Sequence, residues 1–161
     1  MMGGRDQTAD RRAEQAAEVM KIVTARFGEE LDGDFIVLGD LNDYLDPYPD
    51  GRVHPLAPID NVLHNVVAEL TAPLDAWTHY YDDDDAYRQL DYLYVSPRLW
   101  AAAQADGGLD VHIERQGLPW RAERFDGDRI DGVGEDSPKA SDHCPVVLQI
   151  PESAIQQVGA P

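Results

Sequence analysis

The stretch FIVLGDLN, residues 35–42, indicates the fold most clearly. Its first half, Phe35–Leu38, is a short continuous apolar run, and Gly39 ends it. Such a run is typical of a strand that is buried on both faces. Asp40 and Asn42 follow directly, so the sequence predicts two polar side chains at the carboxyl end of a buried strand. Active sites often lie at such strand ends.

Sequence patterns on both sides of this stretch alternate between helix and strand. Apolar residues recur at helical spacing from Thr8 to Phe27 and again around Ile59 to Leu70, which predicts two helices. The segments Trp77–Tyr81 and Leu90–Val95 are rich in aromatic and β-branched residues, and they flank four aspartates, Asp82–Asp85. We expect the two segments to form an antiparallel pair joined by the acidic turn.

The rest of the chain predicts a short helix and two more strands. We expect a helix near Arg98 to Gln104, a strand at Asp110 to Arg115, a long acidic loop through Pro138 and a last strand at Val146 to Ile150. No repeat or linker divides the 161 residues, which fit one domain. The order of elements predicts an α/β fold with a mostly antiparallel sheet covered by helices.

Composition limits the partners that the chain can have. The formal net charge is -18, so the chain lacks the basic character of proteins that hold nucleic acid by their own charges. A single cysteine, Cys144, excludes an internal disulfide and a zinc site built from several cysteines. No apolar run approaches the roughly 18 residues needed to cross a bilayer, so we expect no membrane span. The cellular location stays open.

Asp40 and Asn42 are the first candidate site residues. They lie two positions apart, so their side chains share a face if extended geometry continues beyond the strand. An aspartate there can orient or deprotonate water, and an asparagine can donate to a phosphoryl oxygen. The alternative is a plain strand-ending turn, which residues 39–42 alone do not exclude.

Two later segments place further acid and imidazole groups beside strands. Asp91 stands in an otherwise apolar and aromatic run, where a buried carboxylate needs a partner such as histidine. Asp142 and His143 precede the last strand and combine a metal-type carboxylate with an imidazole that titrates near neutral pH. Taken singly, a solvent-facing Asp91 and an Asp-His cap before a strand also account for these residues.

Together the three segments resemble the endonuclease/exonuclease/phosphatase superfamily. In that family a Gly-Asp-hydrophobic-Asn segment, an Asp-Tyr-hydrophobic segment and a closing Ser-Asp-His-x-Pro-Val segment line one site on a four-layered α/β sandwich. The matching segments here are residues 39–42, 91–93 and 141–146, in the same order. The resemblance therefore implies that this α/β chain is part of such a sandwich.

The resemblance implies a role for each candidate residue. Asp40 would activate or position the attacking water, and Asn42 would bind the phosphate or the nucleophile. Asp91 would orient His143, which would stabilise or protonate phosphoryl oxygens. Asp142 and Asp40 would bind the cofactor, Mg²⁺ or Mn²⁺. A carboxylate behind an imidazole fixes its tautomer and raises its basicity, which agrees with this grouping.

The resemblance also implies that part of the fold lies outside these residues. Family members carry an earlier half with a metal-binding Glu and an Asn near the first strand, and nothing before residue 39 matches either. We therefore expect residues 1–161 to be a partial domain of a metal-dependent phosphoesterase, most simply a phosphodiesterase or nuclease. The missing amino-terminal half, or another partner, would cover its exposed sheet face, and the isolated chain would have little activity.

Two other functions compete with this hypothesis. The chain can be a non-catalytic remnant or a partner-binding module of the same fold. It can also be an acidic cation binder built around Asp82–Asp85, although that tetrad lacks the alternating ligands and the glycine of a calcium loop. The substrate stays open among nucleic acids, inositol phosphates and lipid phosphodiesters, since the acidity only disfavours long duplex DNA.

Overall fold

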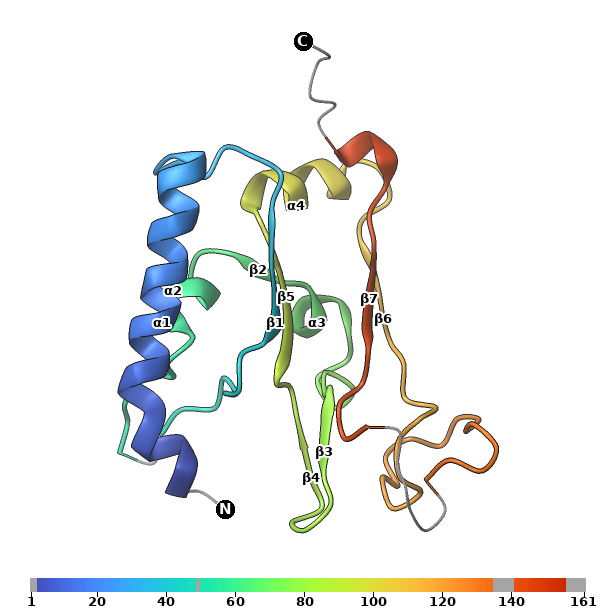
Figure 1. The fold of residues 1–161 in the computed structure, drawn as a ribbon. Helices are drawn as coiled ribbons and strands as arrows, with labels where there is room; N and C mark the ends of the chain where they lie inside the picture. Colours follow the sequence, from blue (N-terminus) through green and yellow to red (C-terminus); the bar gives the residue numbers. More distant parts are fainter. Residues whose placement is uncertain (1–2, 49, 135–140, 156–161) are drawn as a thin grey trace.

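A computed structural model describes residues 3–48, 50–134 and 141–155 of the chain. Its helices and strands, labelled in Figure 1, are α1 (Gly3–Phe27), β1 (Ile36–Asp40), α2 (Ala57–Asp60), β2 (His64–Asn65), α3 (Val66–Leu70), β3 (His79–Tyr81), β4 (Ala86–Arg88), β5 (Asp91–Val95), α4 (Pro97–Gln104), β6 (Asp110–Ile113), β7 (Val146–Gln149) and the 3-10 helix η1 (Glu152–Ala154). Mixed helices and antiparallel strands make the fold α/β, as the sequence predicts.

The central sheet has three strands in the order β1-β5-β2, and all of its pairs are antiparallel. Because side chains alternate along a strand, the β1–β5 ladder has two distinct faces. One face, here called the sealed face, carries Val37, Tyr92 and Tyr94. The opposite one, here called the open face, carries Ile36, Leu38, Asp40, Asp91, Leu93 and Val95. The candidate aspartates therefore share the open face.

Helices α1 and α2 cover the sealed face. Apolar positions of α1, including Ala16 and Val23, are buried against the tyrosines of β5 together with Ile59 of α2. Gly28, at a φ of 78°, ends α1 because a residue without Cβ adopts this left-handed conformation freely. The helix begins at Gly3, earlier than the Thr8 that the sequence predicts.

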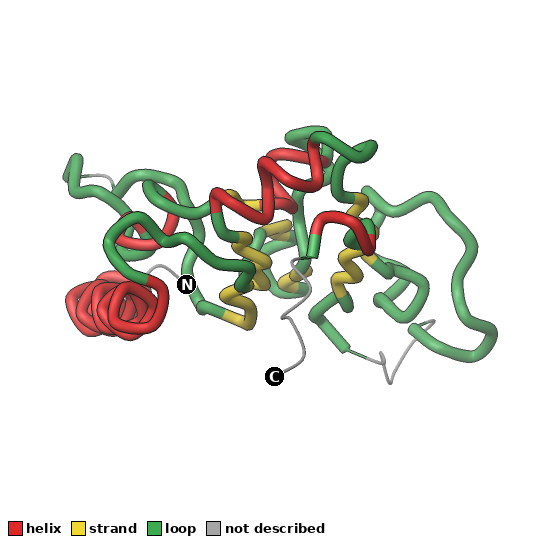
Figure 2. Tube along the Cα trace, turned by 90° about the horizontal axis from the view of Figure 1, so that it is seen from above, coloured by secondary structure: helices red, strands yellow, loops and turns green. Residues whose placement is uncertain are grey.

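The open face meets a second, two-stranded sheet made of β6 and β7. Val146 and Leu148 of β7 pack with Leu93 and Val95 of β5 in one hydrophobic cluster, which Leu99 of α4 completes. Figure 2 shows α1 and the β6–β7 pair on opposite sides of the central sheet. Asp40 and Asp91, at one end of the central sheet, lie near His143, which precedes β7.

The expectation that Phe35–Leu38 is buried on both faces is wrong for this chain. Phe35, Ile36 and Val37 are half-buried, whereas Leu38 is 65% exposed. The physical reason lies in the second sheet, in which β7 pairs only with β6 among the described residues. Among the described residues no further strand pairs with the other edge of β7, and Leu38 remains exposed.

The predicted pairing around the acidic tetrad is also wrong. Strand β3 pairs with β4, whose residues 86–88 follow the tetrad directly, and not with β5. Strand β2 pairs only with Tyr94 and Val95 of β5. The start of β5 contacts the hairpin through a side chain, because the Thr78 hydroxyl accepts hydrogen bonds from the Leu90 and Asp91 backbone N–H groups. Asp85 reverses the chain early, at a φ of 47° that aspartate tolerates better than most residues.

The single helix expected over Ile59 to Leu70 is divided into α2 and α3. Between them β2 adds residues 64–65 to the edge of β5. Asn65 ends this strand and caps α3, since its side chain accepts a hydrogen bond from the Ala68 N–H at 3.3 Å. Asparagine favours such caps over helix interiors, and pairing with the sheet overrides the helical periodicity.

The remaining elements follow the sequence-based expectations to within two residues. Helix α4 and strands β6 and β7 occur where short apolar patterns predict them. In the loop after β6, Arg129 donates to the carbonyls of Leu118, Pro119, Ala122 and Phe125. The end of the expected acidic loop, residues 135–140, lies outside the described residues. Within the described helices none has the length and apolar character required to traverse a bilayer.

Candidate active site

Asp40 and Asn42 form the first part of the site, where β1 ends. The chain does not continue as an extended strand, because Asn42 adopts a left-handed conformation with a φ of 54°. The two side chains nevertheless meet. The Asn42 backbone N–H donates to Asp40 Oδ1 at 2.9 Å, and its amide Nδ2 donates to Asp40 Oδ2 at 3.0 Å. The turn therefore fixes the carboxylate of Asp40 in one orientation.

Asp91 lies directly opposite Asp40 on the neighbouring strand. The two residues are register partners in the β1–β5 ladder and share the open face. The hydroxyl of the fully buried Thr78 accepts hydrogen bonds from the backbone N–H groups of Leu90 and Asp91, at 3.1 and 2.9 Å. Like charges directly opposite each other destabilise a strand pair, so this arrangement favours a cation or a cationic group beside it.

His143 is the group that Asp91 contacts. Its Nδ1 lies 2.9 Å from Asp91 Oδ2, which is the contact that the sequence predicts. The hydroxyl of Ser141 accepts a hydrogen bond from the His143 backbone N–H at 3.0 Å and so holds the turn that presents the ring. A carboxylate at Nδ1 assigns the proton to that nitrogen and leaves Nε2 to face a ligand.

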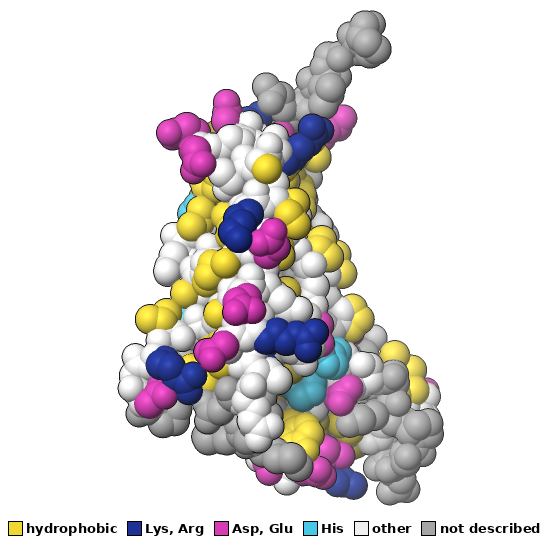
Figure 3. Space-filling view, turned by 60° about the vertical axis from the view of Figure 1, so that its left-hand side comes forward, with side chains coloured by type: hydrophobic (Ala, Val, Ile, Leu, Met, Phe, Trp, Pro, Cys, Tyr) yellow, Lys and Arg dark blue, Asp and Glu magenta, His cyan; other side chains and the backbone are white. Residues whose placement is uncertain are grey.

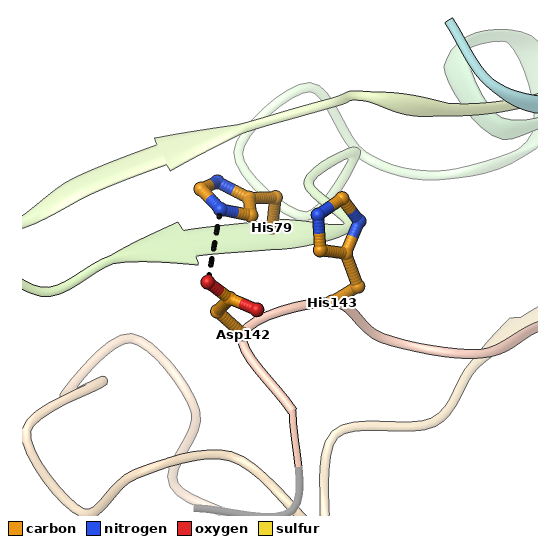
Figure 4. A group of neighbouring side chains, drawn as sticks. All are labelled: His79, Asp142 and His143. Atoms are coloured by element: carbon orange, nitrogen blue, oxygen red, sulfur yellow. Dashed lines mark ion pairs between the residues drawn. The ribbon is translucent and has the colours of Figure 1, made fainter. Parts of the chain in front are cut away.

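Asp142 points to a different histidine. Its Oδ2 lies 3.7 Å from His79 Nε2, and its side chain is 44% exposed. Figure 4 shows Asp142 and His143 projecting from the same segment toward His79 on β3. The structure thus gathers two overlapping groups, one of Asp40, Asp91 and His143 and one of His79, Asp142 and His143, each with ligand atoms within 4.8 Å of one another.

His79 is the site residue that the sequence does not reveal. It lies in the segment that predicts a strand, and nothing local separates it from a structural histidine. Its place depends on an isolated antiparallel bridge to His143, 64 positions away in the chain. Burial first, and then the neighbouring His143, lower the pKa of His79 below its ordinary value. In the sequence Trp77, His79 and Tyr81 stand two positions apart, and this spacing does not identify His79 as a site residue.

Cavities flank the site on two sides. Asp91 and His143 line a cavity of about 440 Å³ together with Leu118 and Ile130. Asp40 and Asn42 line a separate hollow of about 290 Å³ beside Arg12. Asp40, Asp91 and His143 nevertheless bring their ligand atoms within 4.8 Å of one another.

Arg12 and Cys144 lie close to the site but serve the fold. Arg12 Nε donates to the fully buried carboxylate of Asp43 at 2.8 Å, so the cation balances a buried acid. Burial raises the pKa of the Cys144 thiol to about 12, and the residue is 3% exposed. A buried thiol that stays protonated at neutral pH is no nucleophile.

The acidic tetrad Asp82–Asp85 forms the tip of the β3–β4 hairpin. Within the described part of the chain, none of its four carboxylates joins a group of three side chains that could hold a metal ion. Asp83 accepts a hydrogen bond from the Tyr81 hydroxyl, and Asp82 lies 3.6 Å from Arg121. These contacts fit a solvated turn and give no support to a cation-binding function of the tetrad.

The surface around the histidines is mixed in charge. In Figure 3 histidine side chains lie together at the surface, next to a basic side chain and close to an acidic one. The site as a whole offers carboxylates for a hard cation, an imidazole oriented by a carboxylate, and an amide that donates to the carboxylate of Asp40. Such a set suits transfer of a phosphoryl group to water.

Comparison with known families agrees with this chemistry. The model of the Endonuclease/Exonuclease/phosphatase family matches residues 6–143, which cover most of the chain and include both Asp40 and His143. A comparison with curated protein sequences gave no match.

Proposed function

The chain belongs to the endonuclease/exonuclease/phosphatase family, and from this premise we propose that it is a metal-dependent hydrolase of phosphate esters, a phosphodiesterase or nuclease. The family is one of hydrolytic phosphoesterases and nucleases. The observation that carries the proposal is the contact of Asp91 with His143 at 2.9 Å, with Asp40 in the same group. This contact joins residues from two distant motifs on one face of the sheet.

The residues present fit a divalent cation. Asp40 and Asp142 offer carboxylate oxygens, the ligands that Mg²⁺ and Mn²⁺ prefer, and one or two carboxylates with several waters are enough for Mg²⁺. The opposed carboxylates of Asp40 and Asp91 give a second reason, since a cation nearby relieves their repulsion. When bound, the cation supplies Lewis-acid activation of the phosphoryl group.

The protein side chains have separate tasks in this proposal. Asp40, held by two hydrogen bonds from Asn42, positions or deprotonates the attacking water. The Asn42 amide has a second hydrogen, which can donate to a phosphoryl oxygen. His143 Nε2 faces the phosphoryl group and, once protonated, donates to its oxygens. Asp91 stabilises the charge that His143 gains.

The acidic composition narrows the manner of substrate binding. At a formal net charge of -18 the protein surface repels a phosphate backbone, so the bound cation and the few histidines and arginines near the site must meet the phosphate. Small phosphodiesters, or nucleic acid held at few phosphates, satisfy this condition better than long duplex DNA does.

We further propose that residues 1–161 are a partial domain of a four-layered sandwich and that another layer covers the open face. Two observations support this. Leu38 is 65% exposed although its neighbours on the open face, Leu93 and Val95, are buried. Strand β7 has a β partner on one side only among the described residues. Strands added beside β7 would lie over Leu38, and such a layer could also bring further metal ligands.

The function is tested by hydrolysis of bis(p-nitrophenyl) phosphate by the protein that contains these residues, with Mg²⁺ or Mn²⁺ added. We expect turnover that stops in excess chelator and falls by about 10² to 10⁴ in His143→Ala and in Asp40→Asn. His112→Ala is the matched control, because His112 is an exposed histidine of β6 outside the site. Full turnover in chelator, or equal rates in all three variants, would contradict the proposal.

A further inference from the structure

Two imidazole rings lie side by side at the edge of the site because the backbone sets them there. His79 and His143 face each other in an isolated antiparallel bridge. The backbone bonds on either side of the pair run from Tyr80 N to Asp142 O at 2.9 Å and from Cys144 N to Thr78 O at 2.7 Å. Residues paired in this manner have closely spaced side chains on one face. Their ring centroids are 4.7 Å apart.

The distance between His79 and Asp142 is close to the distance between two ligands of one metal ion. His79 Nε2 and Asp142 Oδ2 are 3.7 Å apart, beyond the range of about 2.7 to 3.2 Å for an N–H···O hydrogen bond. Two ligands bound to one tetrahedral cation at about 2.0 to 2.2 Å each lie about 3.3 to 3.6 Å from one another. The spacing of His79 Nε2 and Asp142 Oδ2 therefore suits two ligands of one cation.

His143 contributes the third atom. Its Nδ1 is occupied by Asp91 at 2.9 Å. In Figure 4 its other ring nitrogen points to the side on which His79 and Asp142 lie. A metal-bound histidine usually has a carboxylate at its second nitrogen, which fixes the ring and raises its basicity, and Asp91 occupies that position.

Only one of the two ring nitrogens of His79, Nε2, is placed to bind a metal ion. Its side chain is 12% exposed, and its Nδ1 is buried without a hydrogen-bond partner among the described residues. Its Nε2 points toward Asp142. Asp142 is 44% exposed, which leaves a path from solvent to the space between the three groups.

We propose that His79, Asp142 and His143 bind one divalent transition-metal cation, with Zn²⁺ as the best-fitting ion. The three potential ligand atoms lie within 4.8 Å of one another. Two imidazole nitrogens and one carboxylate oxygen form the donor set of open zinc sites, whereas Mg²⁺ prefers oxygen ligands alone. Water or a phosphate oxygen completes the coordination.

This site has a consequence for catalysis that rests on the proposed function. His143 belongs both to the Asp40 group and to the His79 group. A Zn²⁺ ion bound to His143 Nε2 occupies the nitrogen that would donate to the phosphoryl oxygens. Zn²⁺ therefore inhibits hydrolysis supported by Mg²⁺, and His79→Ala relieves that inhibition. The binding of Zn²⁺ itself requires no hydrolase activity.

The test is binding of Zn²⁺ to the 161-residue chain, measured by isothermal titration calorimetry, with NMR of the imidazole nitrogens. The chain has five histidines, so each ring can be followed. We expect one equivalent of Zn²⁺ to shift the resonances of His79 and His143 and to leave those of the other three histidines unchanged. His79→Ala should weaken binding by at least about 10-fold, the loss that follows from disturbing even an outer-shell partner.

His112→Ala is the matched control. Its Nε2 lies 3.6 Å from Glu114 Oε2, almost the same spacing as in the His79–Asp142 pair, but no third ligand joins them in the described part of the chain. Its Zn²⁺ affinity should equal that of the wild type. Asp142→Asn provides a second variant if His79→Ala is poorly folded. Unchanged affinity in both His79→Ala and Asp142→Asn, or shifts at His143 without His79, would overturn the proposal whatever the outcome of the hydrolysis assay.

Discussion

The two faces of the β1–β5 ladder carry different kinds of polar group. On the sealed face the Tyr94 hydroxyl donates to Asp60 Oδ1 at 2.9 Å, and the tyrosine is fully buried under α1 and α2. On the open face Asp91 bonds His143 at 2.9 Å, with side chains that are 24% and 33% exposed. The distances are equal, but Tyr94 is fully buried, whereas both side chains of the open-face contact are partly exposed and can meet a ligand.

Under the proposed function, the contact on the sealed face serves stability and the contact on the open face serves chemistry. A hydrogen bond from a buried phenol to a carboxylate stabilises one packing arrangement. The open face instead brings two carboxylates opposite each other, which costs stability unless a cation is present. Strain of this kind, tolerated on one face only, is typical of a functional site.

The largest expected effect comes from breaking the polar contact of the open face. In Asp91→Asn the amide no longer balances a positive charge on His143, so kcat for phosphodiester hydrolysis should fall by about 10² to 10⁴ with little change in KM. The melting temperature should stay the same or rise, because the repulsion from Asp40 is removed. Steady-state kinetics and thermal melts measure both.

Asp110→Asn serves as the control for charge, since Asp110 is an exposed aspartate of β6. Its kcat should match that of the wild type. If Asp91→Asn keeps full kcat, or loses it only in proportion to unfolding, then Asp91 is a structural residue and the two faces do not differ in the way described.

The sequence predicts the polar contact of the open face because each member lies in a recognisable motif. Asp40, Asp91 and His143 stand beside strands, and the resemblance joins them before any geometry is known. His79 escapes prediction for a physical reason. Its partner is set by a bridge between a hairpin and a distant loop, and long-range pairings of this kind leave no local periodicity.

The fold was predictable to a similar degree. Local signals determine α1, β1 and α4, where helical periodicity, an apolar run and the Ser96 cap act within a few residues. The pairing of β5 was not predictable, since three strands of suitable composition could compete for its edges. Strand β3 pairs with β4 instead, because Asp85 reverses the chain directly after the tetrad and before β5 begins.

An intermediate effect is expected from the exposed leucine of the open face. If another layer covers Leu38, the chain alone should associate with itself through this face, because burying a leucine side chain stabilises by about 1.5 to 3 kcal/mol. Leu38→Glu should then weaken self-association by about 10- to 100-fold in sedimentation velocity. Val53→Glu is the control, since Val53 is 70% exposed but lies in the loop before α2. Equal sedimentation of the two variants would contradict the covering layer.

The smallest effect is expected on the sealed face, from Tyr94→Phe. The change removes the hydrogen bond to Asp60 and leaves the ring stacked on Tyr92, at a centroid distance of 5.4 Å. Asp60 stays hydrated, with 22% of its side chain exposed and His54 at 3.8 Å. We therefore expect a loss of about 1 kcal/mol in the free energy of unfolding at pH 7 and no change in kcat.

The size of this loss should depend on pH with a definite sign. Burial, and then the charge of Asp60, raise the pKa of Tyr94 above its ordinary value of 10.0. The folded chain keeps the phenol protonated where the unfolded chain ionises it, so the wild type loses about 1.4 kcal/mol per pH unit above pH 10 from this residue. The Phe variant has no such loss, and the other tyrosines cancel in the comparison. In urea unfolding, the wild type should have the higher free energy of unfolding by the full difference at pH 7 to 9. This difference from Tyr94→Phe should be gone by about pH 11. A difference that stays constant or grows with pH would mean that Tyr94 is open to solvent and that the sealed face is not closed.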